Sequence, residues 1–115
     1  MQNLRKVPLA YNELESIQTA DKLLKKSFPV KRMILFGSKT RGEADEHSDI
    51  DILIICSRVL NWKEEKELSG MLFDIGIEYD VIFSPLFTTE NEFNGGIFTY
   101  FPIYNEIVNT GATVL

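Results

Sequence analysis

Four residues at fixed spacing are the strongest indication of chemistry in this chain. Gly37 and Ser38 follow an apolar run, and after ten intervening residues come Asp49 and Asp51, separated by one isoleucine. A glycine at the end of a strand lets the backbone approach a ligand closely. A serine there adds its hydroxyl to the backbone N–H groups that open the next helical turn. We therefore expect this turn to cradle the phosphates of a nucleotide triphosphate.

Asp49 and Asp51 are candidate metal ligands. At the start of a strand, residues two apart point to the same face, with Cα atoms roughly 6 to 7 Å apart. Mg²⁺ suits such oxygen ligands, because it usually binds one or two carboxylates together with phosphate oxygens of the substrate. Two metal ions can clamp an in-line phosphoryl displacement, an arrangement that favours a third carboxylate.

Asp80 is the candidate for that third carboxylate. The alternation of residues 77–83 predicts a strand, with Glu78 and Asp80 on one face. A carboxylate in the middle of an apolar strand is costly to desolvate unless a metal ion or a strong partner holds it. Glu78 shares the predicted face and is the alternative, but we favour Asp80.

The loop between the two halves of the motif carries further candidates. Arg41 could contact nucleotide phosphates, or pair with a nearby acid among Glu43, Asp45 and Glu46. Ser48 is suited to hydrogen-bond the turn and orient Asp49. We interpret His47, the only histidine, as a solvated side chain rather than a general base.

The elements that must position these residues alternate between helix and strand. The patterning predicts helices over 12–26 and 61–76, strands over 30–36, 50–56 and 77–83, and a helix over 102–111. Asn12 with Glu15 and Asn61 with Glu64 resemble capping boxes. The order favours one α/β (α+β) domain over residues 1–115, with a small mixed β-sheet flanked by helices.

Composition disfavours nucleic-acid and membrane partners. The 115 residues carry a formal net charge of −5, which disfavours nonspecific binding to a nucleic-acid backbone. No apolar run approaches the roughly 20 residues that span a bilayer, so we expect no membrane contact and a cytoplasmic protein. Cys56, the single cysteine, ends an apolar run and is expected to be buried and inert.

Gly37-Ser38 followed by Asp49-Ile50-Asp51 resembles the signature of the DNA polymerase beta-like nucleotidyltransferase superfamily, and most closely its minimal nucleotidyltransferase branch. The resemblance extends from about Val30 to Phe83 and includes Arg41-Gly42, Ser48 and an acidic residue at Asp80. The tail from Pro102 to Gly111 is also similar. The resemblance implies the fold of that superfamily. It also implies nucleotide binding by Gly37, Ser38, Arg41 and Ser48, and catalysis and metal binding by Asp49, Asp51 and Asp80.

The resemblance also implies an activity and a partner. Members transfer a nucleoside monophosphate, here most simply AMP from ATP, to a hydroxyl with the help of two Mg²⁺ ions. Minimal nucleotidyltransferases are often antitoxins that adenylylate a helical HEPN-type toxin. The alternatives are an enzyme that modifies a small hydroxylated compound, as aminoglycoside nucleotidyltransferases do, and a catalytically idle module that neutralises its partner by contact.

Overall fold

A five-stranded mixed sheet lies at the centre of the computed structural model, which describes residues 1–43 and 49–114. The strand order is β1-β5-β2-β3-β4. The strands are β1 (Gln2–Asn3), β2 (Val30–Phe36), β3 (Ile50–Cys56), β4 (Phe83–Thr89) and β5 (Ala112–Thr113). Because β3 runs antiparallel to β2 and parallel to β4, the sheet is mixed, and the predicted α/β fold class is confirmed.

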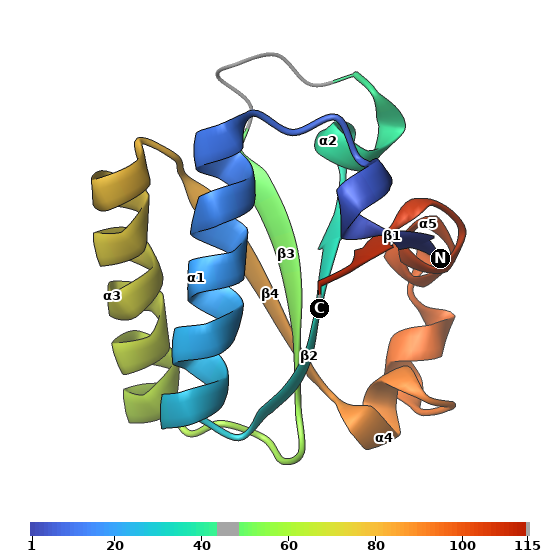
Figure 1. The fold of residues 1–115 in the computed structure, drawn as a ribbon. Coiled ribbons are helices and arrows are strands. Elements are labelled where there is room, and N and C mark those ends of the chain that lie inside the picture. The colour runs from blue at the N-terminus through green and yellow to red at the C-terminus, as the bar shows by residue number, and fades with distance from the viewer. Residues whose placement is uncertain (44–48, 115) are drawn as a thin grey trace.

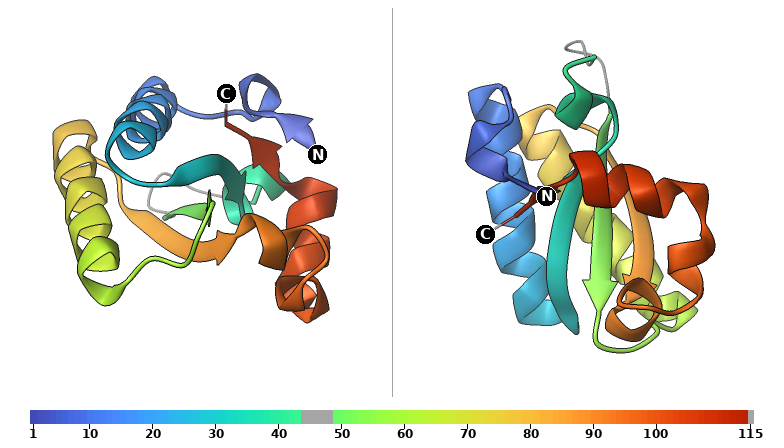
Figure 2. Two further views of the ribbon diagram at one scale, coloured as in Figure 1. Left: turned by 90° about the horizontal axis from the view of Figure 1, so that it is seen from below. Right: turned by 90° about the vertical axis from the view of Figure 1, so that its right-hand side faces the viewer.

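Helices cover both faces of the sheet, as Figures 1 and 2 show. They are α1 (Tyr11–Ser27), α2 (Ser38–Arg41), α3 (Trp62–Tyr79), α4 (Glu90–Phe93) and α5 (Pro102–Thr110), with 3-10 turns η1 (Leu4–Lys6) and η2 (Ile97–Tyr100). One core cluster packs the sheet against α1 and α3, and a second packs the opposite face against α4, η2 and α5. Among the helices of the described residues, none is long and apolar enough to cross a bilayer.

Strands β2 and β3 begin and end at the residues predicted from the sequence. The reason is visible in β3, where every residue from 52 to 56 is buried. A strand covered by helices on both faces requires an unbroken apolar run instead of an alternating one. Both strands that carry the motif are therefore rigid central elements of the sheet.

Helix α1 begins earlier than predicted. Ala10 is the N-cap, and the Glu13 carboxylate accepts a hydrogen bond from the Ala10 backbone N–H at 2.8 Å. The predicted box between Asn12 and Glu15 is wrong, because the Asn12 side-chain amide instead donates to the carbonyl oxygen of Tyr79 at 2.8 Å. That contact joins the start of α1 to the end of α3.

The prediction of a strand over 77–83 is wrong for every residue but the last, because α3 runs to Tyr79 and strand β4 begins only at Phe83. Helix α3 starts at the predicted cap, Asn61, but continues past Gly76 to Tyr79, whose hydroxyl lies 3.1 Å from the Thr19 hydroxyl. Tyr79 continues the buried face of the helix, so tertiary packing extends α3 by three residues. Gly76 lies where the chain folds back after the helix. A Cβ there would lie 2.6 Å from the Val81 carbonyl oxygen, so a glycine is needed at this position.

Strand β4 contains Pro85. β4 is the last strand in the sheet order, and among the described residues it pairs with β3 alone. Proline has no backbone N–H to donate. It is tolerated on an edge strand because one side of that strand has no neighbour to accept a hydrogen bond.

The aromatic residues of the tail divide between core and surface. Phe93 and Phe98 are buried, with ring centroids 5.8 Å apart, and Tyr104 packs against both. Tyr100 and Phe101 are exposed.

Candidate functional site

Gly37 lies directly against the carboxylate of Asp51. Phe36 pairs with Asp51 in the antiparallel ladder of β2 and β3, so the glycine that follows β2 lies beside the beginning of β3. Its φ of +82° is in the left-handed region, and a Cβ on it would lie 2.2 Å from Asp51 Oδ2. The two halves of the sequence motif are therefore in contact, and a side chain at position 37 would have to displace the Asp51 carboxylate.

Asp49 and Asp51 share one electrostatic environment. Asp49 is exposed just before β3, while Asp51 is partly buried on it. Burial raises the pKa of Asp51, the negative charge of Asp49 raises it further, and the guanidinium of Arg41 lowers it. The negative charge of Glu106 also raises this pKa. Two ionised carboxylates in this position repel each other unless a cation lies between them.

The two aspartates suit a Mg²⁺ ion that also binds phosphate. Both supply hard carboxylate oxygens, and the repulsion that raises the pKa of Asp51 would be relieved by a divalent cation. Within residues 1–43 and 49–114, no cluster of three histidine, cysteine or acidic side chains is close enough to hold a metal ion. The pair therefore fits an ion whose remaining ligands come from substrate and water.

Ser38 is the first residue of α2 and is half-buried. The turn around it is closed by local hydrogen bonds: the Thr40 hydroxyl donates to the Gly37 carbonyl oxygen at 2.9 Å, and the Glu43 N–H donates to the Ser38 carbonyl oxygen at 3.1 Å. Gly42 ends the helix with φ +72°. These bonds fix the backbone of the turn that follows Gly37, and Gly37 itself lies against Asp51.

Lys39 points into the protein. It is 5% exposed and forms an ion pair with Glu13, whose other carboxylate oxygen caps α1. A lysine beside a phosphate-binding turn would ordinarily be a candidate phosphate ligand. Here its ammonium is used to attach α2 to α1.

Arg41 is held by two carboxylates. Its Nε lies 3.2 Å from Glu43 Oε2, and its Nη1 pairs with Glu106 of α5. Pairing with Glu43 was one of the two interpretations of Arg41, and these contacts also place its charge near Asp51. Glu106 was missed, because nothing in local spacing connects two residues 65 positions apart.

Asp80 is an exposed C-cap, not a residue of a strand interior. It closes α3 with φ 57°, and the argument that burial demands a ligand for it is therefore wrong. Its backbone nevertheless approaches the same end of the sheet, since the Ile50 N–H donates to the Ile82 carbonyl oxygen at 2.8 Å. The structure does not bring its carboxylate into a cluster with the other two. Glu78 is likewise exposed, near the end of α3.

Four loop residues of the sequence interpretation, Asp45, Glu46, His47 and Ser48, lie outside the described residues. The orientation of Asp49 by Ser48 stays a prediction.

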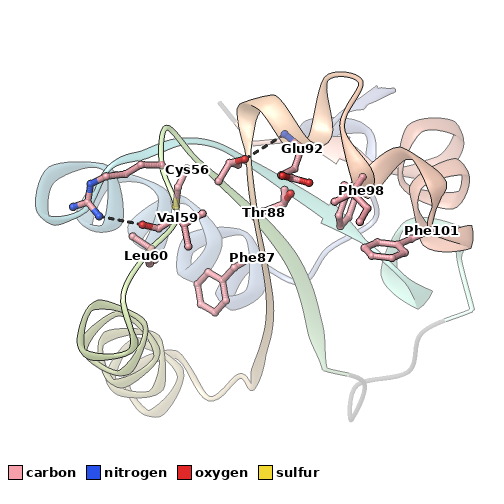
Figure 3. Close-up of a pocket in the computed structure, with 11 residues that line it drawn as sticks. Cys56, Val59, Leu60, Phe87, Thr88, Glu92, Phe98 and Phe101 are labelled. Carbon is pink, nitrogen blue, oxygen red and sulfur yellow. Dashed lines mark hydrogen bonds between the residues drawn. The ribbon is translucent and has the colours of Figure 1, made fainter.

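A separate hollow lies at the other end of β3. Cys56, Leu60, Phe87 and Phe98 line this pocket of about 320 Å³, and Figure 3 shows Glu92 at its side. Cys56 is buried there, as expected. Because none of the predicted site residues lines it, this pocket is distinct from the aspartate pair.

Residues 18–100 match the family model described as polymerase beta, nucleotidyltransferase. The match covers both halves of the motif and most of the chain, and the chain belongs to this family of nucleotidyltransferases.

Two curated relatives match part of this chain. The protein adenylyltransferase MntA of Thermococcus cleftensis is 51% identical over 47 residues, which are 40% of this chain and 48% of that protein. A relative from Methanocaldococcus jannaschii is 38% identical over 55 residues, which are 48% of this chain and 56% of its own. The matched part of the chain therefore spans about half the length of these relatives.

Solved structures share the fold. A chain in a crystal structure of a toxin-antitoxin with AMP-PNP superposes with a TM-score of 0.57 at 19% identity, over 90% of this chain and 72% of the other. A chain of the toxin-antitoxin MntA-HepT gives a TM-score of 0.53 at 19% identity, over 86% of this chain and 68% of the other.

Proposed function

We propose that this chain transfers AMP from Mg²⁺-bound ATP to a hydroxyl group on a partner protein, and releases pyrophosphate. The observation that carries the proposal is the contact between Gly37 and the Asp51 carboxylate, beside Asp49. A backbone turn without a side chain faces two carboxylates that repel each other. This pairing suits a substrate that arrives as a complex of metal and triphosphate.

Each side chain is proposed to have one role. Asp49 and Asp51 would hold Mg²⁺, which when bound would supply positive charge to offset the triphosphate and would lower the pKa of the attacking hydroxyl. Ser38 and the Gly37 backbone bind phosphate oxygens, and Arg41 adds a positive charge at the same end of the sheet. The acceptor oxygen forms a bond to the α-phosphorus as the bond from that phosphorus to the bridging oxygen breaks. The acceptor proton passes to a carboxylate or to water.

Asp80 is proposed as the third carboxylate, acting once substrate is bound. Its backbone lies at the same end of the sheet as Asp49 and Asp51, and its side chain is exposed. A small rotation of an exposed C-cap side chain costs little, so binding of a second Mg²⁺ could recruit it. Ser48 is proposed to orient Asp49.

The acceptor is proposed to be a helical HEPN-type toxin, with this chain as its antitoxin. The support is that a relative is named protein adenylyltransferase MntA, and that chains of similar fold come from toxin-antitoxin structures. An idle binding module is the second candidate. It is disfavoured because Gly37, which has no side chain, leaves space for the Asp51 carboxylate beside the charge of Asp49. Simple docking does not need such an arrangement.

The test is the intact mass of the partner. The chain is incubated with ATP, Mg²⁺ and a candidate HEPN-type partner, and the mass of the partner is then measured. We expect a gain of one or more AMP units with wild type and none with Asp51→Asn. A stable complex with no mass gain would instead support the idle module. AMP found only on a small hydroxylated compound would support an enzyme that modifies small molecules.

The third carboxylate has its own matched pair of variants. Asp80→Asn and Glu78→Gln each remove one charge from an exposed residue near the end of α3. We expect transfer to fall by roughly 100-fold or more in Asp80→Asn and to stay near wild type in Glu78→Gln. Equal rates in both variants would remove Asp80 from the site, and the reverse order would assign the role to Glu78.

A further inference from the structure

The pocket at the end of β3 that carries Cys56 has apolar side chains from three separate parts of the chain in its lining. Leu60 comes from the loop before α3, Phe87 from β4 and Phe98 from η2. Its volume of about 320 Å³ is room for roughly ten water molecules at the density of the liquid. Water between such walls finds few hydrogen-bond partners, so the pocket suits an organic ligand with an apolar body.

A carboxylate lies in this apolar lining. Glu92 of α4 is at the side of the pocket in Figure 3, and its Oε2 atom is buried without a hydrogen-bond partner. Thr89 and Glu92 have the spacing of a capping box, yet only half of the box forms: the Glu92 N–H donates to the Thr89 hydroxyl at 3.2 Å. A buried carboxylate oxygen without a donor costs free energy that a ligand with a donor would recover.

The neighbouring cations are already used elsewhere. Arg58 lines the same pocket, but its Nη1 and Nη2 atoms lie 2.8 and 2.7 Å from the two carboxylate oxygens of Glu64. Arg32 lies over the ring of Phe93, with its guanidinium carbon 5.8 Å from the ring centroid. Neither arginine donates to Glu92 Oε2. The charge that this carboxylate lacks must therefore come with the ligand.

We propose that this pocket binds a small organic amine, with its ammonium group on the Glu92 carboxylate and its apolar body between Leu60, Phe87 and Phe98. A charge-assisted hydrogen bond and the burial of the apolar body then stabilise the complex together. A phosphate or nucleotide is disfavoured because Glu92 would repel it. A bare metal ion is disfavoured because it would find one carboxylate among apolar walls.

This pocket is separate from the aspartate pair. Asp51 and Cys56 stand near opposite ends of β3, and the rise of a strand, about 3.3 Å per residue, sets them about 16 Å apart. The inference does not depend on the proposed transfer reaction. Its test measures binding alone, so either proposal can fail without the other.

Two probes of equal shape separate charge from apolar contact. Phenethylamine is a cation at neutral pH, and phenethyl alcohol has the same ring and chain without the charge. Each is added to the isotope-labelled chain, and the backbone amide shifts are followed by NMR. We expect saturable shifts at residues 56–60, 87–92 and 97–101 with the amine at roughly millimolar concentration, and binding of the alcohol that is about tenfold weaker or more.

Glu92→Gln tests the carboxylate directly. The variant should weaken binding of phenethylamine by roughly tenfold or more and bring it level with the alcohol. Because it also removes a buried charge without a partner, its melting temperature should equal or exceed that of wild type. Glu90→Gln removes the same charge from α4 at a residue that does not line the pocket, and it should leave binding unchanged.

Several outcomes would overturn the proposal. They are an absence of saturable shifts, equal affinity for amine and alcohol, amine binding that survives Glu92→Gln, and shifts that gather around Asp51. A Glu92→Gln variant that melts well below wild type would show that the carboxylate already has a partner in the fold. Tighter binding of Nα-acetyl-lysine amide than of phenethylamine would assign the pocket to a side chain of a partner protein, and would also overturn it.

Discussion

Gly37 is the residue at which the backbone and the carboxylates of the site meet. Replacement by alanine places a methyl group on the Asp51 carboxylate and strains a backbone with positive φ. Gly42→Ala is the matched control, because Gly42 also has positive φ but a Cβ there meets nothing within 4 Å. We expect Gly42→Ala to lower the free energy of unfolding by about 1 kcal/mol and Gly37→Ala by clearly more, with loss of transfer. Urea unfolding measures both, and equal losses would mean that the contact with Asp51 is unimportant.

Asp51 should make the stability of the chain depend on pH and on Mg²⁺. Burial and the charge of Asp49 raise its pKa, so its contribution is full below the unfolded-state pKa of about 3.9 and is lost as the pH rises through the folded-state pKa. In EDTA at neutral pH, Asp51→Asn should therefore melt at a higher temperature than wild type, and the difference should vanish near pH 3. A variant that melts lower than wild type under the neutral condition would contradict this.

Mg²⁺ is expected to change the comparison. The cation favours the ionised pair, so it should raise the melting temperature of wild type and much less that of Asp51→Asn. Thermal scans with and without Mg²⁺ measure this directly. Equal Mg²⁺ effects on both proteins would place the ion elsewhere.

Helix α2 is too short to be stable alone, and its position depends on ion pairs to its neighbours. Lys39 joins it to α1 through Glu13, and Arg41 joins it to α5 through Glu106. Isolated helices need more than one turn to persist in water, so tertiary contacts must hold this one. The turn at Gly37 and Ser38 is therefore held in place by contacts to the helices that flank it.

The pair between Lys39 and Glu13 gives a prediction at this scale. Lys39→Met should lower the free energy of unfolding by roughly 2 kcal/mol, because it leaves a mostly buried carboxylate without its cation. Adding Glu13→Gln should recover part of the loss, as the amide oxygen can still cap α1. A double-mutant cycle by urea unfolding measures the coupling, and strictly additive losses would show that the two residues act independently.

At the scale of the whole molecule, the two ends of the chain meet beside the site. β1 pairs with β5, and the Gln2 side-chain amide donates to the Thr110 carbonyl oxygen at 3.0 Å and approaches that of Thr40 at 3.5 Å. The C-terminal helix thus contacts α2 both through Gln2 and through Glu106. The tail contributes to the site although the motif lies far from it in sequence.

Glu106→Gln tests that contribution. Loss of one of the two carboxylates that hold Arg41 should raise the KM for ATP by roughly two- to fivefold, with little change in kcat, as expected for an exposed ion pair. Asn105→Ala, at an exposed neighbouring position of α5, is the control. Steady-state adenylylation of the partner gives both constants, and an unchanged KM would show that Glu43 alone positions Arg41.

Much of the fold and half of the site follow from local sequence. β2 and β3 were predicted to the residue because strands buried on both faces need unbroken apolar runs, and the Asn61 cap of α3 is a local hydrogen-bond pattern. The proximity of Gly37 to Asp51 follows from two adjacent strands. Residues 77–83 were misassigned because alternating apolar residues suit both a strand and the last turn of a helix, and the packing of Tyr79 decided for the helix.

The sequence by itself determined the two central strands and the aspartate pair, since both depend on residue types a few positions apart. Only the tertiary structure decided that Lys39 faces Glu13, that Glu106 holds Arg41 and that Asp80 is an exposed cap. These contacts join residues far apart in the chain, and such pairs are set by how helices pack on the sheet. Local propensity contains no information about that packing.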